Sequence, residues 1–179
     1  LVARVTGSEP ALSWFPGAAF EMESLGLAFV FFIWGLILSI ASEITHRTET
    51  THKFSLPVLL VSIPTFGLAL LNGFIDSVTM GFVIALGITC IYTALHILRT
   101  RGWLWALALL NFIIAYFAFF NLTFIEKADI FLGYQLLGIS ILFLLPDLFL
   151  KNDFKADPAW RLPQSIYGVA FTAVNILLY

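Results

Sequence analysis

The chain has 179 residues, of which 60% are hydrophobic and only 11% are charged. This composition is far more apolar than that of soluble domains of similar length and predicts a membrane protein with several spans. The net charge of -2 gives no basic field for nucleic acid, and one cysteine with three histidines gives no metal-site spacing, so we expect neither nucleic-acid binding nor a metal or other cofactor.

Residues 1–23 contain prolines and glutamates and lack the continuous apolar segment of a signal peptide, so they predict an exposed arm outside the cytoplasm. The remainder, 24–179, predicts an all-α transmembrane domain. Windows of about 20 apolar residues, which cross roughly 30 Å of hydrocarbon, fall at 24–42, 55–73, 78–98, 103–124, 129–150 and 163–179. We therefore expect six transmembrane helices in the lipid bilayer.

The distribution of positive charge predicts the orientation of these spans. Seven of the nine Lys and Arg residues fall on one side of them, namely Arg47, Lys53, Arg99, Arg101, Lys151, Lys155 and Arg161. Because cytoplasmic loops are enriched in Lys and Arg, we expect this side to be cytoplasmic and both termini to lie outside, in the cell (inner) membrane. Trp103, Trp105 and Trp160 lie near span ends and predict interfacial anchors.

A weak internal repeat links the first, third and fifth spans. Gly35, Gly87 and Gly138 are followed by aliphatic residues and are separated by 52 and 51 residues (87 − 35 and 138 − 87). The repeat predicts three helical hairpins, all inserted in the same orientation. Alternatively, such a similarity arises by chance among Leu-, Ile- and Phe-rich helices.

The third span carries polar residues on one face. Thr89, Tyr92, Thr93 and His96 have the spacing i, i+3, i+4, i+7. The fifth span adds Ser140, Phe143 and Asp147 at equivalent places, and one face of the sixth carries Gln164, Gly168, Thr172 and Asn175. One interpretation is a narrow amphipathic path through the protomer. The alternative is that hydroxyls bond back to their own helices and that the polar faces hold helices together.

No span carries a buried pair of carboxylates, a Lys or an Arg, which argues against an ion pump, a voltage sensor or a proton-coupled carrier. There is also no set of nucleophile, base and orienting group, so we do not expect an enzyme. An uncharged lining suits small neutral solutes better than ions. The predicted lining residues are Thr89, Tyr92, Thr93, His96, Ser140, Phe143, Tyr167, Thr172 and Asn175.

Three segments resemble the AmiS/UreI family of short-chain amide transporters and acid-activated urea channels: "GITCIYTA" from Gly87, "QLLGISILFLLPDLFLK" around Gly138, and "PAWRLPQSIYGVAFTAV" around Gly168. The resemblance implies six helices with both ends outside, a passive channel for urea or short amides in each protomer, and a homo-oligomer, in that family a hexamer.

Two departures from the family pattern stand at predicted lining positions. Tyr167 replaces a Glu that the family carries just before the glycine of the last helix, and Phe143 lies in a fifth helix that is rich in Trp in the family. These departures favour a second hypothesis, that the chain is an accessory subunit of a larger membrane complex and binds other membrane subunits.

Overall fold

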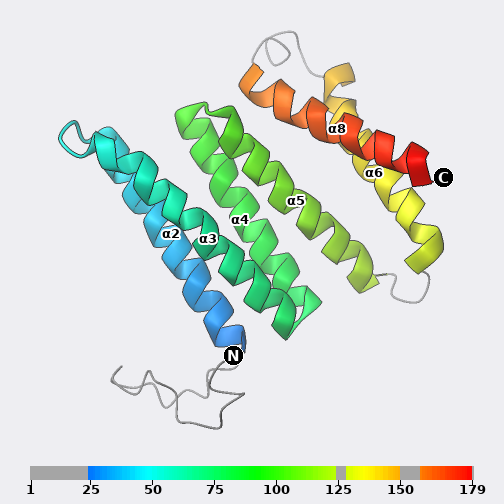
Figure 1. Cartoon of the computed structure of the whole chain (residues 1–179), viewed down its shortest axis with the longest axis horizontal. Coiled ribbons are helices and arrows are strands. Elements are labelled where there is room, and N and C mark those ends of the chain that lie inside the picture. The colour runs from blue at the N-terminus through cyan, green and yellow to red at the C-terminus, as the bar shows by residue number, and fades with distance from the viewer. Residues whose placement is uncertain (1–23, 124–127, 150–157, 179) are drawn as a thin grey trace. The chain divides into compact units, whose positions relative to one another are not determined.

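The computed structural model describes residues 24–123, 128–149 and 158–178. These ranges form helices joined by short turns, and no strand occurs in them, which confirms the all-α prediction. The helices are α2 (Ser24–Arg47), α3 (His52–Asp76), α4 (Val78–Arg99), α5 (Gly102–Thr123), α6 (Ala128–Phe149) and α8 (Pro158–Leu178), as Figure 1 shows. The predicted N-terminal arm, 1–23, lies outside the described residues.

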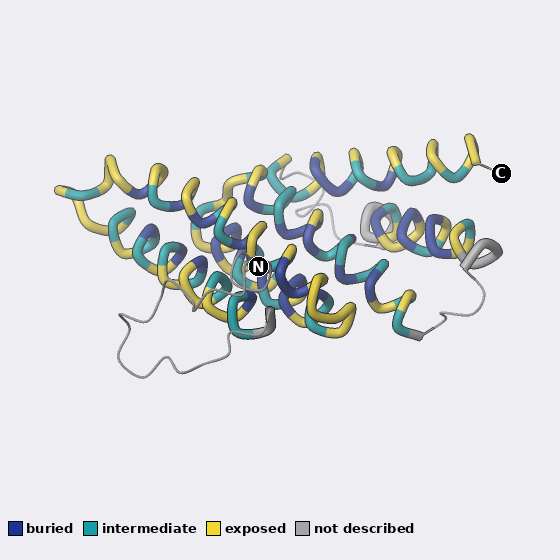
Figure 2. The backbone as a smooth tube through the Cα atoms, turned by 60° about the horizontal axis from the view of Figure 1, so that its bottom comes forward, coloured by how far each residue is buried: buried dark blue, intermediate teal, exposed yellow. Residues whose placement is uncertain are grey.

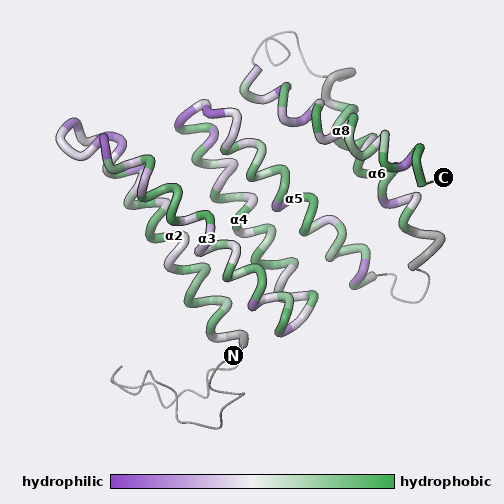
Figure 3. Tube along the Cα trace, in the orientation of Figure 1, coloured by the Kyte–Doolittle hydropathy of each residue, from purple (hydrophilic) through white to green (hydrophobic). Residues whose placement is uncertain are grey.

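Four of these helices are long and apolar enough to cross a membrane: Gly26–Arg47, His52–Asp76, Val78–Arg99 and Gly102–Leu122. In α6 the apolar helix found among the described residues is shorter, Leu132–Leu145, and α8 is not among the four. Four helices among the described residues thus support the prediction of a membrane protein, whereas six spans were expected. Figure 3 shows hydrophobic residues along the bodies of these helices and hydrophilic residues at the turn between α2 and α3.

Buried and exposed residues alternate along the helices (Figure 2). Many large apolar residues are exposed, and several polar residues are buried together with the apolar core. On α8, Gln164 is 7% exposed, whereas Leu162 and Leu177 are 61% and 84% exposed. A protein surrounded by water exposes fewer large apolar side chains, because burying apolar surface drives its folding. In lipid, exposed apolar side chains carry no such penalty, whereas polar groups facing the hydrocarbon are costly, so outward-facing apolar residues are expected in a bilayer.

The chain divides into two compact units, residues 1–80 and 81–179. In the first unit, α2 and α3 pack along a seam of mostly small residues at spacings of three, four and seven, which is the pattern of helices crossing at a shallow angle. The buried seam residues of α2 and α3 are Ala28, Gly35, Ser39, Ser42, Ser55, Leu59, Ser62, Phe66 and Ala69. The missing side chain of Gly35 makes room for the ring of Phe66.

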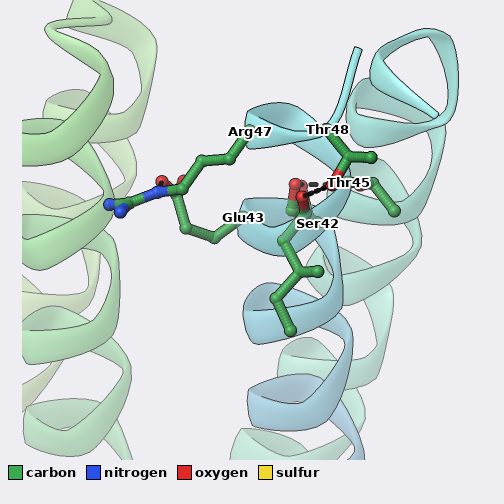
Figure 4. Close-up of polar contacts among 6 residues, drawn as sticks. Ser42, Glu43, Thr45, Arg47 and Thr48 are labelled. Atoms are coloured by element: carbon green, nitrogen blue, oxygen red, sulfur yellow. Dashed lines mark hydrogen bonds and ion pairs between the residues drawn. The ribbon is translucent and has the colours of Figure 1, made fainter. Parts of the chain in front are cut away.

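Hydrogen bonds fix the end of α2 against α3. The Ser42 hydroxyl donates to the carbonyl of Ser55 across the helix pair at 2.6 Å. Figure 4 shows the neighbouring contacts, in which Thr45 donates to the Ser42 carbonyl at 2.9 Å and Arg47 donates to Glu43 at 2.8 Å. The ion pair is largely exposed on its arginine side and contributes little to stability. Of these three bonds, the buried one to Ser55 is the bond that joins α2 to α3.

In the second unit, α4 and α5 run antiparallel. Phe82 lies 5.9 Å from Phe119 at one end of the pair, and His96 lies 5.7 Å from Trp105 at the other, measured between ring centroids. The helices α5, α6 and α8 share an apolar core of Leu109, Ile113, Ile139 and Phe143, against which Trp105, Phe112, Tyr116, Phe117, Tyr167 and Phe171 pack. This core holds the polar positions of α6 and α8 in place.

Candidate functional site

The candidate site of the second unit lies at the tight turn between α4 and α5. Thr100 has φ of 50°, in the left-handed region that a residue with a side chain seldom adopts. Its amide donates to the carbonyl of His96 at 2.6 Å, which closes the last turn of α4. The chain reverses there, and the carbonyl of Arg101 comes to lie 2.9 Å from Nδ1 of His96.

This contact defines which nitrogen of His96 carries the proton. A carbonyl oxygen can only accept a hydrogen bond, so Nδ1 of His96 must be the donor to Arg101. In a neutral imidazole the other nitrogen, Nε2, then has a lone pair and no hydrogen. His96 is fully buried. The protein therefore presents a hydrogen-bond acceptor, Nε2, in its interior.

Two tryptophans enclose His96. Trp105 of α5 stacks on the imidazole at 5.7 Å, and Trp160 of α8 meets it edge-on at 4.2 Å, with 4.9 Å between the two indoles. The two helices come close at Gly102 of α5, where an added Cβ would lie 3.3 Å from the backbone of Ala159 on α8, a tight contact. We refer to His96, Trp105 and Trp160 as the histidine–tryptophan cluster.

The cluster contains two buried polar atoms without a protein partner among the described residues, Nε2 of His96 and Nε1 of Trp105. The first is an acceptor and the indole N–H is a donor only. Leaving a buried polar group unpaired costs about 1–3 kcal/mol. The cluster thus buries one donor and one acceptor that bond to no described residue.

The predicted polar face of α4 points into the protein. Tyr92 is 2% exposed and buried like His96, while Thr89 and Thr93 are half-buried. Each threonine hydroxyl donates to a carbonyl of its own helix, Thr89 to Ala85 at 2.8 Å and Thr93 to Thr89 at 2.7 Å. These bonds use the hydroxyl hydrogens but leave oxygen lone pairs free to accept.

The serine and threonine of the other predicted faces bond in the same way. The hydroxyl of Ser140 donates to Leu136 at 2.7 Å, and that of Thr172 donates to Gly168 at 2.8 Å. Asn175 is half-buried. The side chain of Asp147, the predicted polar end of the fifth span, lies outside the described residues.

Longer side chains connect the helices of this unit. Tyr167 of α8 donates to the carbonyl of Ala106 on α5 at 3.3 Å, and its ring lies 6.2 Å from that of Phe143 on α6. Gln164 donates to the carbonyl of Phe143 at 2.9 Å. These contacts bring two of the predicted lining residues, Phe143 and Tyr167, together and join Tyr167 to α5 at the residue that follows Trp105.

Trp105 and Trp160 were expected to be membrane anchors and not site residues, and Gln164 was left out of the predicted lining. One feature of the sequence could have placed Trp105 near His96. The short turn 99–102 makes α4 and α5 antiparallel neighbours, and His96 and Trp105 lie at similar distances from it on either side. Trp160 had no such signal, because its contact depends on how α8 packs.

Among the described residues, no group of three or more His, Cys, Asp or Glu could hold a metal ion. No protein-family model, no curated protein and no solved structure matches the chain.

Proposed function

We propose that the chain is a passive membrane channel for small uncharged polar solutes such as urea or short-chain amides, with its path inside the second unit. The observation that carries this proposal is the inward placement of polar groups on helices whose large apolar residues face outward. Tyr92, His96, Ser140 and Gln164 are all buried on α4, α6 and α8. Their donors and acceptors suit a solute that exchanges water for protein hydrogen bonds.

The described interior favours neutral solutes over ions. Its buried polar residues in this unit are His96, Asn111, Gln135, Ser140 and Gln164, with no Asp, Glu, Lys or Arg among them. An ion would have to lose its hydration shell, which requires charged side chains or rings of carbonyl oxygens. A urea or amide molecule needs only a few donors and acceptors, which these side chains and the hydroxyl lone pairs supply.

The proposal also includes the arrangement of the chain in the membrane. It comprises three hairpins in one orientation, both termini outside the cytoplasm, the cell inner membrane, and a homo-oligomer of AmiS/UreI type. Arg47 and Arg99 at the ends of α2 and α4, and Arg161 in the first turn of α8, support a cytoplasmic location for those helix ends.

Flux measurements test the channel directly. The purified protein is reconstituted into liposomes, and swelling is followed by light scattering in urea, formamide and acetamide gradients. We expect permeability above that of protein-free vesicles, with no permeability to sodium or chloride. Equal swelling of loaded and empty vesicles for all three solutes would contradict the proposal.

A second candidate function is that of an accessory subunit in a larger membrane complex. It is favoured by the hydroxyls of Thr89, Thr93, Ser140 and Thr172, which all donate to their own helices and so can be structural. Purification in a mild detergent separates the candidates. Copies of this chain alone favour the channel, whereas other subunits in fixed stoichiometry favour the accessory role.

A further inference from the structure

We propose that the end of the second unit at which α4, α5 and α8 meet binds the headgroup of an anionic phospholipid. Three arginines lie at this end, and we refer to Arg99, Arg101 and Arg161 as the arginine cluster. The proposal goes beyond the channel and does not depend on it, because it concerns the outer surface at the membrane boundary.

Contacts between α5 and α8 bring these arginines together. Arg99 ends α4, and Arg101 follows two residues later in the turn to α5. Gly102, the first residue of α5, lies close to α8, since an added Cβ there would be 3.3 Å from the backbone of Ala159. Arg161 is two residues beyond that contact, in the first turn of α8. Three separate parts of the chain thus contribute one arginine each or two to a single end of the unit.

The charges of this unit are all at that end. Its described side chains are those of residues 81–122, 132–145 and 158–178, and the charged ones among them are the arginine cluster, with no Asp, Glu or Lys. Residues 147–157, which precede α8 in the sequence, add three Asp and two Lys, so the count is five positive charges against three negative ones. The end therefore keeps an excess of positive charge.

The turn between α2 and α3 has no such excess. Residues 43–53 carry two Glu, one Arg and one Lys, and Arg47 donates to Glu43 at 2.8 Å. The turn between α3 and α4 follows Asp76 and contains no Lys or Arg. Of the described turns, only the one between α4 and α5 attracts an anion by its charge.

The surface around the arginine cluster suits a phospholipid better than a free anion. Arg101 and Arg161 are exposed. Leu98, next to Arg99, is 54% exposed, and Leu162, next to Arg161, is 61% exposed. Because α4 and α5 are long and apolar enough to cross a membrane, their shared end lies at its boundary. A guanidinium binds a phosphate group through two parallel hydrogen bonds, while the exposed leucines contact the acyl chains.

Quenching of Trp103 fluorescence by brominated lipids measures which lipid lies at this end. Trp103 is two residues from Arg101 and is 37% exposed. The full-length protein is reconstituted into bilayers of phosphatidylcholine and phosphatidylglycerol, with bromine in the acyl chains of one lipid at a time. The difference between the wild type and Trp103→Phe gives the signal of Trp103. We expect a preference for phosphatidylglycerol of about fivefold or more, since each arginine near an anionic headgroup contributes about that factor.

Matched variants test the origin of the preference. Arg101→Gln and Arg161→Gln should each lower it by about fivefold. Arg47→Gln, which removes an arginine of the first unit, should leave it unchanged. Trp34, 54% exposed on α2, is the control tryptophan, and its signal, obtained with Trp34→Phe, should be quenched equally by the two lipids.

Three results would each overturn the proposal. The first is equal quenching of Trp103 by the two lipids in the wild type, a comparison that holds even if an arginine variant fails to fold. The second is a preference that Arg101→Gln and Arg161→Gln both retain. The third is a preference that inorganic phosphate abolishes at constant ionic strength, because the arginine cluster would then bind free phosphate and not a lipid.

Discussion

Gly35 of α2 lies directly against the ring of Phe66 of α3. A Cβ atom added at Gly35 would be 2.6 Å from both Cδ1 and Cε1 of that ring, well inside van der Waals contact. Phe66 is only 2% exposed and cannot swing away into lipid. The closeness of the two helices therefore depends on the absence of a single methyl group.

Gly35→Ala is expected to destabilise the first unit. Because the buried ring must move or α2 must shift, the cost should be about 1–3 kcal/mol, typical of overpacking. Gly67→Ala is the matched control, since a Cβ there has no atom within 4 Å. Unfolding in mixed micelles should show a loss for Gly35→Ala only, and equal stability of the two variants would contradict the packing described.

Ser42→Ala should cost more stability than Ser39→Ala. Both serines are buried on α2, but Ser42 donates to Ser55 on α3, whereas Ser39 donates to Gly35 of its own helix. Interhelical hydrogen bonds in membranes contribute about 0.6 kcal/mol on average and up to about 1.7 kcal/mol. We expect a loss in that range for Ser42→Ala and a smaller one for Ser39→Ala. The same micelle assay measures both, and a reversed order would refute the assignment.

Gly138→Ala should be tolerated better when the hydroxyl of Tyr116 is absent. An added Cβ would lie 2.6 Å from that oxygen but 3.8 Å from the ring carbon that bears it. The hydroxyl cannot turn away without losing its bond to the carbonyl of Gln135, which is 3.1 Å long. A double-mutant cycle with Tyr116→Phe should give a coupling energy of about 0.5 kcal/mol or more. Strict additivity would show that the two residues do not meet.

Tyr92→Phe is expected to change solute selectivity. Tyr92 is buried on the predicted lining face of α4, and loss of one hydrogen-bonding group is worth about 1 kcal/mol, or roughly fivefold in rate. The ratio of urea to acetamide permeability in liposomes is the measurement. Tyr134→Phe, at a site 67% exposed, serves as the control. If both variants keep the wild-type ratio, Tyr92 does not line the path.

The sequence predicted the helices well because length and apolarity act locally. Each expected window overlaps a helix, and the start expected at residue 78 is that of α4. Gly35 and Gly138 stood out as repeated glycines, yet their partners could not be predicted. Phe66 follows Gly35 in the chain, whereas Tyr116 precedes Gly138, because the rotation of each helix about its axis decides which side chain fills the gap.

The candidate site was only partly predictable, for a similar reason. Spacing placed Tyr92 and His96 on one face of a helix, and both are buried. Residue spacing could not show whether a threonine hydroxyl bonds to its own helix or to a neighbouring one, because a threonine can make either bond. Trp160 looked like an anchor because a tryptophan near a helix end suits a membrane interface equally well. Its edge-on contact with His96 depends on tertiary packing.

The pairing of α2 with α3 also bears on how the chain is made. Their seam joins segments that are adjacent in the sequence, and the hydroxyls of Ser39, Ser42 and Ser62 all find acceptors within this pair. Nothing synthesised after residue 76 is needed to complete these bonds. Local contacts of this kind form early, and N-terminal parts of a chain fold first during synthesis. The first two helices can therefore settle against each other in the bilayer while the ribosome is still translating the rest of the protein.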